Sequence, residues 1–115
     1  DRKDPPALQA RHDLMRAKLF GFTERRETVL RRYPPHDRSA PALYARAILA
    51  HRSGQLSEAL TLVDGLLQGA ANNAYYHELR GQILLESGRA REAVAPLRRA
   101  VQLAPGAAPI RTLLG

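Results

Sequence analysis

An internal repeat constrains the fold of this chain more than any other feature. When the sequence is shifted so that Gly54 falls on Gly88, it also matches itself at other small, apolar and charged residues, in the pairs Ala59/Ala93, Glu58/Glu92, Arg46/Arg80, Ala47/Gly81, Gly81/Gly115, Ala74/Ala108 and Leu79/Leu113. A fixed period of about 20 to 50 residues indicates a solenoid, in which each unit buries its apolar face against its neighbours. The repeat therefore predicts a stack of similar units.

The clearest copy of the repeat predicts two helices joined by a tight turn, about Ala74–Ser87 and Ala90–Leu103. Gly88 suits the left-handed conformation that ends the first helix, and Pro105 ends the second. Gly81 and Ala93 are small where the two helices approach closely. The period of this repeat is similar to that of the tetratricopeptide repeat. That similarity implies an all-α fold, a right-handed solenoid of antiparallel helix pairs.

The repeat divides the chain into four expected parts. Residues 40–73 and 74–107 are two tetratricopeptide units, and residues 108–115 begin a further repeat helix at which the chain stops. In the unit 40–73 we expect Ser39 to cap the first helix and Pro41 to lie in its first turn. Residues 69–73 form a loop where the other unit has a terminating proline.

Residues 1–39 are expected to form a linker and a degenerate helical hairpin. Its first helix begins at Pro5 or Pro6 and ends at Gly21, and Thr23 caps a second helix that runs to Tyr33. The expected apolar face of the first helix consists of Leu8, Met15 and Leu19, with Leu14 beside them.

Three further predictions concern single positions within the two units. Pro96 lies inside the last long helix, where we expect a mild kink and no break, because the apolar spacing continues beyond it. Glu58 and Glu92 are expected in the first turn of each second helix, where the helix dipole favours a carboxylate. Arg46 and Arg80 are expected at helix edges with their stems packed down.

The composition narrows the possible partners. The net charge is +7, but ten of the 18 basic residues lie in residues 1–40 and eight in residues 41–115. Acidic residues accompany them in both parts, six in residues 1–40 and five in residues 41–115, so neither part is a basic tail. This distribution favours a solvated surface over the basic stripe of a nucleic-acid binder. No apolar run is long enough to span a membrane, and the chain has no cysteine for a disulfide or a thiolate metal site.

No pattern for catalysis or metal binding is present. The four histidines, His12, His36, His51 and His77, lack the spacing of three to five residues that metal-binding pairs on a helix use. Neither a phosphate-binding loop nor a nucleophile motif occurs. We expect no catalytic residue, no cofactor and no metal in this chain.

The first helices of stacked pairs line a concave face, which is the expected place for a partner peptide. The candidate contact residues are Tyr44, Ile48, His51, Arg52, Tyr75, Glu78, Gln82 and Leu85. Exposed aromatic and apolar groups in a groove suit peptide capture. The alternative is that Tyr44, Ile48 and Leu85 pack against a neighbouring helix, and the sequence leaves both open.

Residues 4–22, with the sequence DPPALQARHDLMRAKLFGF, resemble the linker helix that follows the catalytic domain of BepA-like periplasmic zinc metallopeptidases. Residues 44–47 (YARA) and 77–82 (HELRGQ) resemble the tetratricopeptide segment of that family. The resemblance covers essentially the whole chain. Neither the H-E-x-x-H helix nor the glutamate that binds zinc in these enzymes has a counterpart here, so no catalytic residue carries over.

The resemblance implies a parent enzyme in the bacterial periplasm, with zinc in its catalytic domain and a role in outer-membrane protein quality control. This chain would then be its C-terminal targeting or regulatory domain, with the parent's catalytic domain or the outer-membrane assembly machinery as partner. A second hypothesis is a general scaffold that binds a peptide and is unrelated to proteolysis. A third is a nucleic-acid or membrane-surface binder driven by the positive charge.

Overall fold

The structure, a computed structural model, describes residues 6–104. Over this range the chain forms six helices and no strand: α1 (Pro6–Thr23), α2 (Arg26–Arg32), α3 (Ala40–Arg52), α4 (Leu56–Gly69), α5 (Ala74–Glu86) and α6 (Ala90–Leu103). The expected all-α class is confirmed for these residues. The predictions for residues 1–5 and 105–115, including the stop at Pro105 and the helix start at 108–115, lie outside the described residues.

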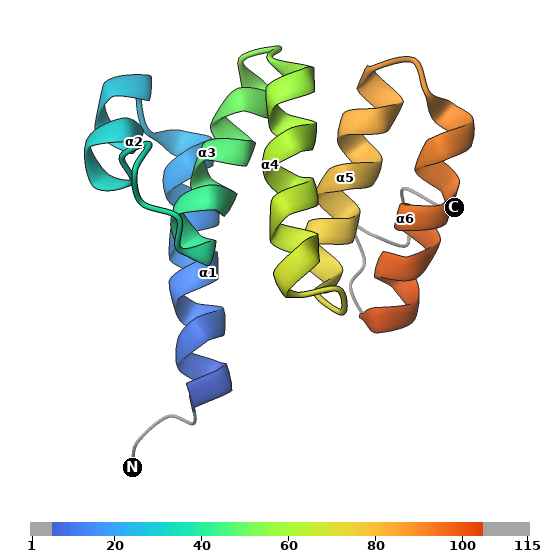
Figure 1. Cartoon of the computed structure of the whole chain (residues 1–115), viewed down its shortest axis with the longest axis horizontal. Coiled ribbons are helices and arrows are strands. Elements are labelled where there is room, and N and C mark those ends of the chain that lie inside the picture. The colour runs from blue at the N-terminus through green and yellow to red at the C-terminus, as the bar shows by residue number, and fades with distance from the viewer. Residues whose placement is uncertain (1–5, 105–115) are drawn as a thin grey trace.

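The helices α3 to α6 stand in a row, and each runs antiparallel to the next (Figure 1). Their bounds follow the sequence repeat, because the shift that carries Gly54 onto Gly88 also carries the ends of α3 onto those of α5 and the ends of α4 onto those of α6. The turn glycines have the same conformation, with φ of 79° at Gly54 and 77° at Gly88. Only glycine adopts this conformation at little steric cost, so each pair closes through the same tight turn.

Equivalent side chains cap the first helix of each pair. The Ser39 hydroxyl accepts a hydrogen bond from the backbone N–H of Ala42 at 3.4 Å, as predicted. At the equivalent position of the next pair, the Asn73 side-chain oxygen accepts from the N–H groups of Tyr75 and Tyr76 at 2.9 and 3.3 Å. Both caps satisfy N–H groups that have no partner within the helix.

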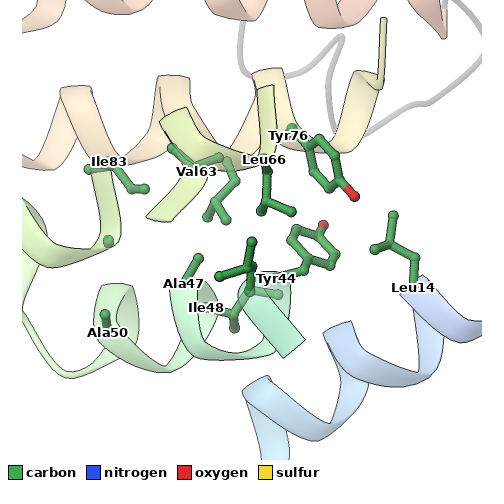
Figure 2. Close-up of a cluster of buried hydrophobic side chains, with 12 residues drawn as sticks. Leu14, Tyr44, Ala47, Ile48, Ala50, Val63, Leu66, Tyr76 and Ile83 are labelled. Atoms are coloured by element: carbon green, nitrogen blue, oxygen red, sulfur yellow. The ribbon is translucent and has the colours of Figure 1, made fainter. Parts of the chain in front are cut away.

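The main core lies where α3, α4 and α5 meet, and α1 closes one side of it. Figure 2 shows the rings of Tyr44 and Tyr76 turned toward each other beside Leu14 of α1. Val63 and Leu66 of α4 cover the same cluster. A second cluster joins Leu84 of α5 to Ala93 and Leu97 of α6. A Cβ added to Gly81 would lie 2.5 Å from Leu97, so this glycine is needed for the close approach of α5 and α6.

The N-terminal helix ends later than expected. The sequence indicates that Gly21 ends the first helix and Thr23 caps the second, and both predictions are wrong. Helix α1 continues through Gly21 to Thr23, whose hydroxyl donates to the carbonyl oxygen of Leu19 at 2.9 Å. Helix α2 starts after Arg25 and has no side-chain cap. Gly21 is instead a contact glycine, because a Cβ there would lie 2.8 Å from the carbonyl oxygen of Ala45 on α3.

The predicted apolar face of α1 is only partly in contact with the core. Leu14, Ala17 and Gly21 are buried against α3, whereas Leu19 is 64% and Phe22 52% exposed. Leu8 is also exposed, and Met15 is only partly buried. Of this predicted face, Leu14 and Met15 contact the main core, whereas Leu8 and Leu19 do not. The cause is that small residues on the other side of α1 allow a closer helix–helix contact than leucines would.

The short helix α2 packs on the start of the repeat region. Val29 and Tyr33 are buried together with Ala17 of α1 and with Ala42, Ala45 and Leu49 of α3. The Phe20 and Tyr33 rings meet edge to face at 5.9 Å. The two N-terminal helices therefore share one small cluster on α3, and α1 runs parallel to α3 (Figure 1).

The repeated arginines differ in burial. Arg46 is buried, and its guanidinium donates to the carbonyl oxygens of Tyr33, Pro34 and Asp37 at 3.3, 2.8 and 2.9 Å. The expected place at a helix edge is wrong for Arg46, because the segment that follows α2 folds over it. Arg80 is half-buried and donates to Asp64 of α4 at 2.8 Å. Each arginine ties the first helix of its pair to the preceding element.

Three other positions agree with the sequence. Glu58 and Glu92 lie in the first turns of α4 and α6. Helix α6 continues without a break through Pro96, which is buried.

Candidate interaction surface

A cavity of about 630 Å³ opens between the start of α1 and the start of α5. Its wall is mainly apolar and includes Leu14, Pro41 and Tyr76. Arg11, Asp13, Asn72, Asn73 and Tyr75 supply the polar groups. An apolar hollow with a few polar groups is the usual form of a binding pocket in a protein.

Side chains from α1 reach across this surface to α5. Arg11 donates to the Tyr75 hydroxyl at 3.3 Å, and the Lys18 ammonium lies 5.1 Å from the centre of the same ring. A cation at this distance over a ring face is attracted by the negative face of the ring. Tyr75 is therefore held in place by two basic side chains of α1, and its ring forms one edge of the cavity.

The surface continues along α5, because Tyr75, Glu78 and Gln82 are spaced to lie on one side of that helix. The Gln82 amide donates to the Glu78 carboxylate. Burial raises the pKa of Glu78, while the charge of Lys18 and the hydrogen bond from Gln82 partly oppose that rise in pKa. A carboxyl of raised pKa beside a lysine can accept a hydrogen bond from a ligand or, when protonated, donate one.

His51 of α3 completes this surface. Its Nε2 atom is fully buried and lies 3.1 Å from a carboxylate oxygen of Glu86, although the two atoms are not aligned for a hydrogen bond. The histidine side chain is 11% exposed and the glutamate 57%. The pair thus places a carboxylate at the end of the row formed by Tyr75, Glu78 and Gln82.

The structure separates the eight expected contact residues into three groups. Tyr44 and Ile48 are each 1% exposed, so they belong to the core and cannot contact a partner. Helix α1 covers this side of α3, as shown by the contact of Gly21 with Ile48. The sequence did not distinguish between a groove position and a core position for these two residues. The packing of α1 places both in the core.

Arg52 and Leu85 lie away from the cavity. The Arg52 guanidinium donates to the carbonyl oxygen of Phe22 at 2.6 Å and to that of Glu24, so it caps the end of α1. Leu85 is 40% exposed on α5. The residues that the structure brings together are Tyr75, Glu78, Gln82 and His51.

Sequence reasoning missed Arg11 and Lys18, which the structure adds to this surface. Their spacing of two helical turns places them on one side of α1. This spacing of two basic residues was a usable signal. It could not be interpreted without knowing that α1 lies parallel to α3 and near α5.

The described part of the chain, residues 6–104, holds no group of three or more histidine, aspartate and glutamate side chains that could bind a metal ion. Within the same residues no helix is both long and apolar enough to cross a membrane. Comparisons with protein-family models, with curated proteins and with solved structures give no match to this chain.

Proposed function

We propose that this chain is a non-catalytic protein–protein interaction domain of the tetratricopeptide type, which binds an extended segment of a partner protein. The observation that carries the proposal is the mainly apolar cavity beside Tyr75, continued along α5 by Glu78 and Gln82. An apolar anchor fits the cavity, and the polar row offers hydrogen-bond partners to the peptide that follows it. The recurrence of the helix bounds from one pair to the next supports a solenoid of helix pairs, and the tetratricopeptide resemblance implies that it is right-handed.

Peptides selected against the intact chain would test this site. A random peptide library displayed on phage is selected on the wild-type chain, and the selected peptides are measured against Ala10→Trp. Ala10 is exposed and lines the cavity, so the indole fills the pocket without removing core. We expect binding to fall by at least about tenfold, since burial of an apolar anchor contributes about 1.5–3 kcal/mol.

The matched control is Ala90→Trp, which adds the same side chain at an exposed position of α6 outside this cavity. It should leave the affinity of the selected peptides unchanged. If Ala10→Trp and Ala90→Trp bind these peptides equally well, the cavity is not the binding site.

We further propose that the domain serves a zinc metallopeptidase of the bacterial periplasm, as its C-terminal targeting or regulatory part in outer-membrane protein quality control. The outer side of α1 supports this proposal. Leu8, Leu19 and Phe22 are exposed there, in the run of sequence that resembles the linker helix of BepA-like enzymes. Three large apolar side chains on one helix face favour contact with another protein surface.

Hydrogen exchange on a mixture of this chain with a separately purified BepA-like catalytic domain tests the second proposal. We expect slower exchange in α1 of the wild-type chain and no slowing in the double variant Leu19→Glu/Phe22→Glu. The control Leu85→Glu/Val94→Glu places two charges at similarly exposed apolar positions of α5 and α6. Unchanged exchange in the wild-type α1 would leave the general scaffold as the better proposal.

A further inference from the structure

A second hollow, of about 550 Å³, lies on another side of the molecule. Leu67 of α4, His77 and Arg80 of α5, and Pro96, Arg98 and Arg99 of α6 line it. We call it the basic groove. It shares no lining residue with the cavity beside Tyr75. Its α5 residues, His77 and Arg80, are spaced three apart and fall on a different side of that helix from Glu78 and Gln82.

The charges of the basic groove are only partly neutralised. Arg80 is paired with Asp64 at 2.8 Å, and Glu92 is paired with Arg89 at 2.6 Å. Arg99 donates to the neutral side chains of Asn72 and Gln102, at 3.0 and 3.4 Å. Those bonds orient its guanidinium without cancelling its charge.

Arg98 has no hydrogen bond or ion pair with any residue in the range 6–104. Among the described lining residues and their ion-pair partners, three arginines and one carboxylate sum to a formal charge of +2. Within the described part of the chain, an anionic ligand therefore meets two guanidinium groups that no carboxylate neutralises.

The floor of the basic groove is apolar. Pro96 is buried, Leu67 is half-buried, and Ala95 stands beside them as a small exposed side chain. A guanidinium binds a carboxylate through two parallel N–H groups, and an apolar floor accepts a side chain next to that carboxylate. We propose that the basic groove binds an acidic segment of a partner protein, with carboxylates on Arg98 and Arg99 and an apolar side chain over Pro96.

The lining favours an acidic protein segment over single-stranded nucleic acid. Such nucleic acids bind by stacking their bases on aromatic side chains along a basic channel. His77 is the one aromatic ring among the described lining residues, and its Nε2–H donates to the carbonyl oxygen of Ala71 at 2.7 Å. This bond holds the imidazole to the backbone at the edge of the groove. Carboxylates with an apolar neighbour fit the remaining surface better.

The test uses the whole chain and a fluorescein-labelled peptide in which glutamate and leucine alternate. Fluorescence anisotropy is measured for the wild type and for Arg98→Glu/Arg99→Glu at about 0.15 M salt, where exposed charges beyond roughly 8 Å are screened. We expect the double variant to bind at least about tenfold more weakly, because carboxylates replace the two guanidinium groups that donate the charge-assisted hydrogen bonds.

The control Arg26→Glu/Arg38→Glu makes the same change in net charge at two exposed arginines outside the groove. It should weaken binding by less than about threefold, as expected for exposed charges at a distance. Equal losses in the two double variants would mean that the overall charge of the chain attracts the peptide, and the proposal would be overturned. Absence of wild-type binding at about 0.15 M salt would overturn it as well.

The variant Ala95→Trp keeps the charge and covers the apolar floor. This variant should weaken the binding of the peptide by at least about threefold, since the leucine side chains lose their contact with Pro96. Unchanged binding by Ala95→Trp would exclude the apolar part of the proposal. The same titrations are repeated with a single-stranded oligonucleotide and with phosphatidylglycerol vesicles, which are the other sources of anion. If either binds more tightly than the peptide and this binding is lost in Arg98→Glu/Arg99→Glu, the groove would be reassigned to that ligand.

Discussion

The repeat region, α3 to α6, and the N-terminal region, α1 and α2, build and end their helices in different ways. In the repeat region equivalent positions have equivalent roles, such as the caps Ser39 and Asn73 and the turn glycines Gly54 and Gly88. In the N-terminal region an 18-residue helix lies parallel to α3, and a seven-residue helix without a side-chain cap follows it. Local sequence rules therefore predict the repeat region well and the N-terminal region poorly.

Tyr44→Ala should have the largest effect, because Tyr44 joins the two regions. Its ring lies 5.4 Å from that of Tyr76 and in the cluster that contains Leu14 of α1. Loss of a fully buried aromatic side chain costs about 3–5 kcal/mol of unfolding free energy. Urea unfolding followed by circular dichroism measures the change.

The control is Leu85→Ala on the exposed side of α5, where the cost should stay below about 1 kcal/mol. A Tyr44→Ala chain as stable as the wild type would show that the two regions are not coupled through this cluster.

The arginine pair tests whether equal repeat positions have equal weight. Arg46→Ala leaves the carbonyl oxygens of Tyr33, Pro34 and Asp37 without their donor in a buried place, at a cost of about 3 kcal/mol. Arg80→Ala removes a partly exposed ion pair with Asp64, which contributes about 1 kcal/mol or less. Thermal unfolding of both variants measures the difference. Similar losses would indicate that the segment after α2 does not depend on Arg46.

The two contact glycines compare helix packing in the two regions. An alanine Cβ at Gly21 would meet the backbone oxygen of Ala45 at 2.8 Å, and α1 can avoid it only by moving away from α3. At Gly81 the obstacle is the Leu97 side chain, which can change its rotamer. We expect Gly21→Ala to cost about 2 kcal/mol and Gly81→Ala about 1 kcal/mol, after the higher helix propensity of alanine has offset part of each cost. The reverse order in urea unfolding would mean that α1 shifts more easily than Leu97.

The smallest effect is the pH dependence that Glu78 adds. Burial raises the pKa of Glu78 in the folded chain, so its charged form is less stable there than in the unfolded chain. The stability from the protonated carboxyl is complete below the unfolded pKa and is lost as the pH rises through the folded pKa. Glutamine does not ionise, so Glu78→Gln should not lose this stability as the pH rises. Its free energy of unfolding at pH 7 should therefore exceed that of the wild type. The melting temperatures of the two chains, measured in parallel from pH 3 to pH 7, test this prediction. A difference between them that stays constant with pH would contradict the raised pKa.

Short-range chemistry within the repeat explains why much of the fold could be predicted. Turn glycines with positive φ, a serine cap and carboxylates in first turns depend on neighbours within a few residues, and the repeat sets them at equal intervals. Those features give the helices α3 to α6 almost as expected, and they place Tyr75, Glu78 and Gln82 on one side of α5. None of them depends on how α1 packs.

Tertiary packing decides how the N-terminal helices are arranged and which residues belong to each surface. Helix α1 has apolar residues on two sides, and only its fit against α3 buries Leu14 and Gly21 and leaves Leu19 and Phe22 exposed. The same fit places Tyr44 in the core and brings Lys18 to Tyr75. The physical reason is that helix periodicity records which residues share a side of a helix. Which side is buried depends on the shape of a distant partner, here the space that the missing side chain of Gly21 opens to α3.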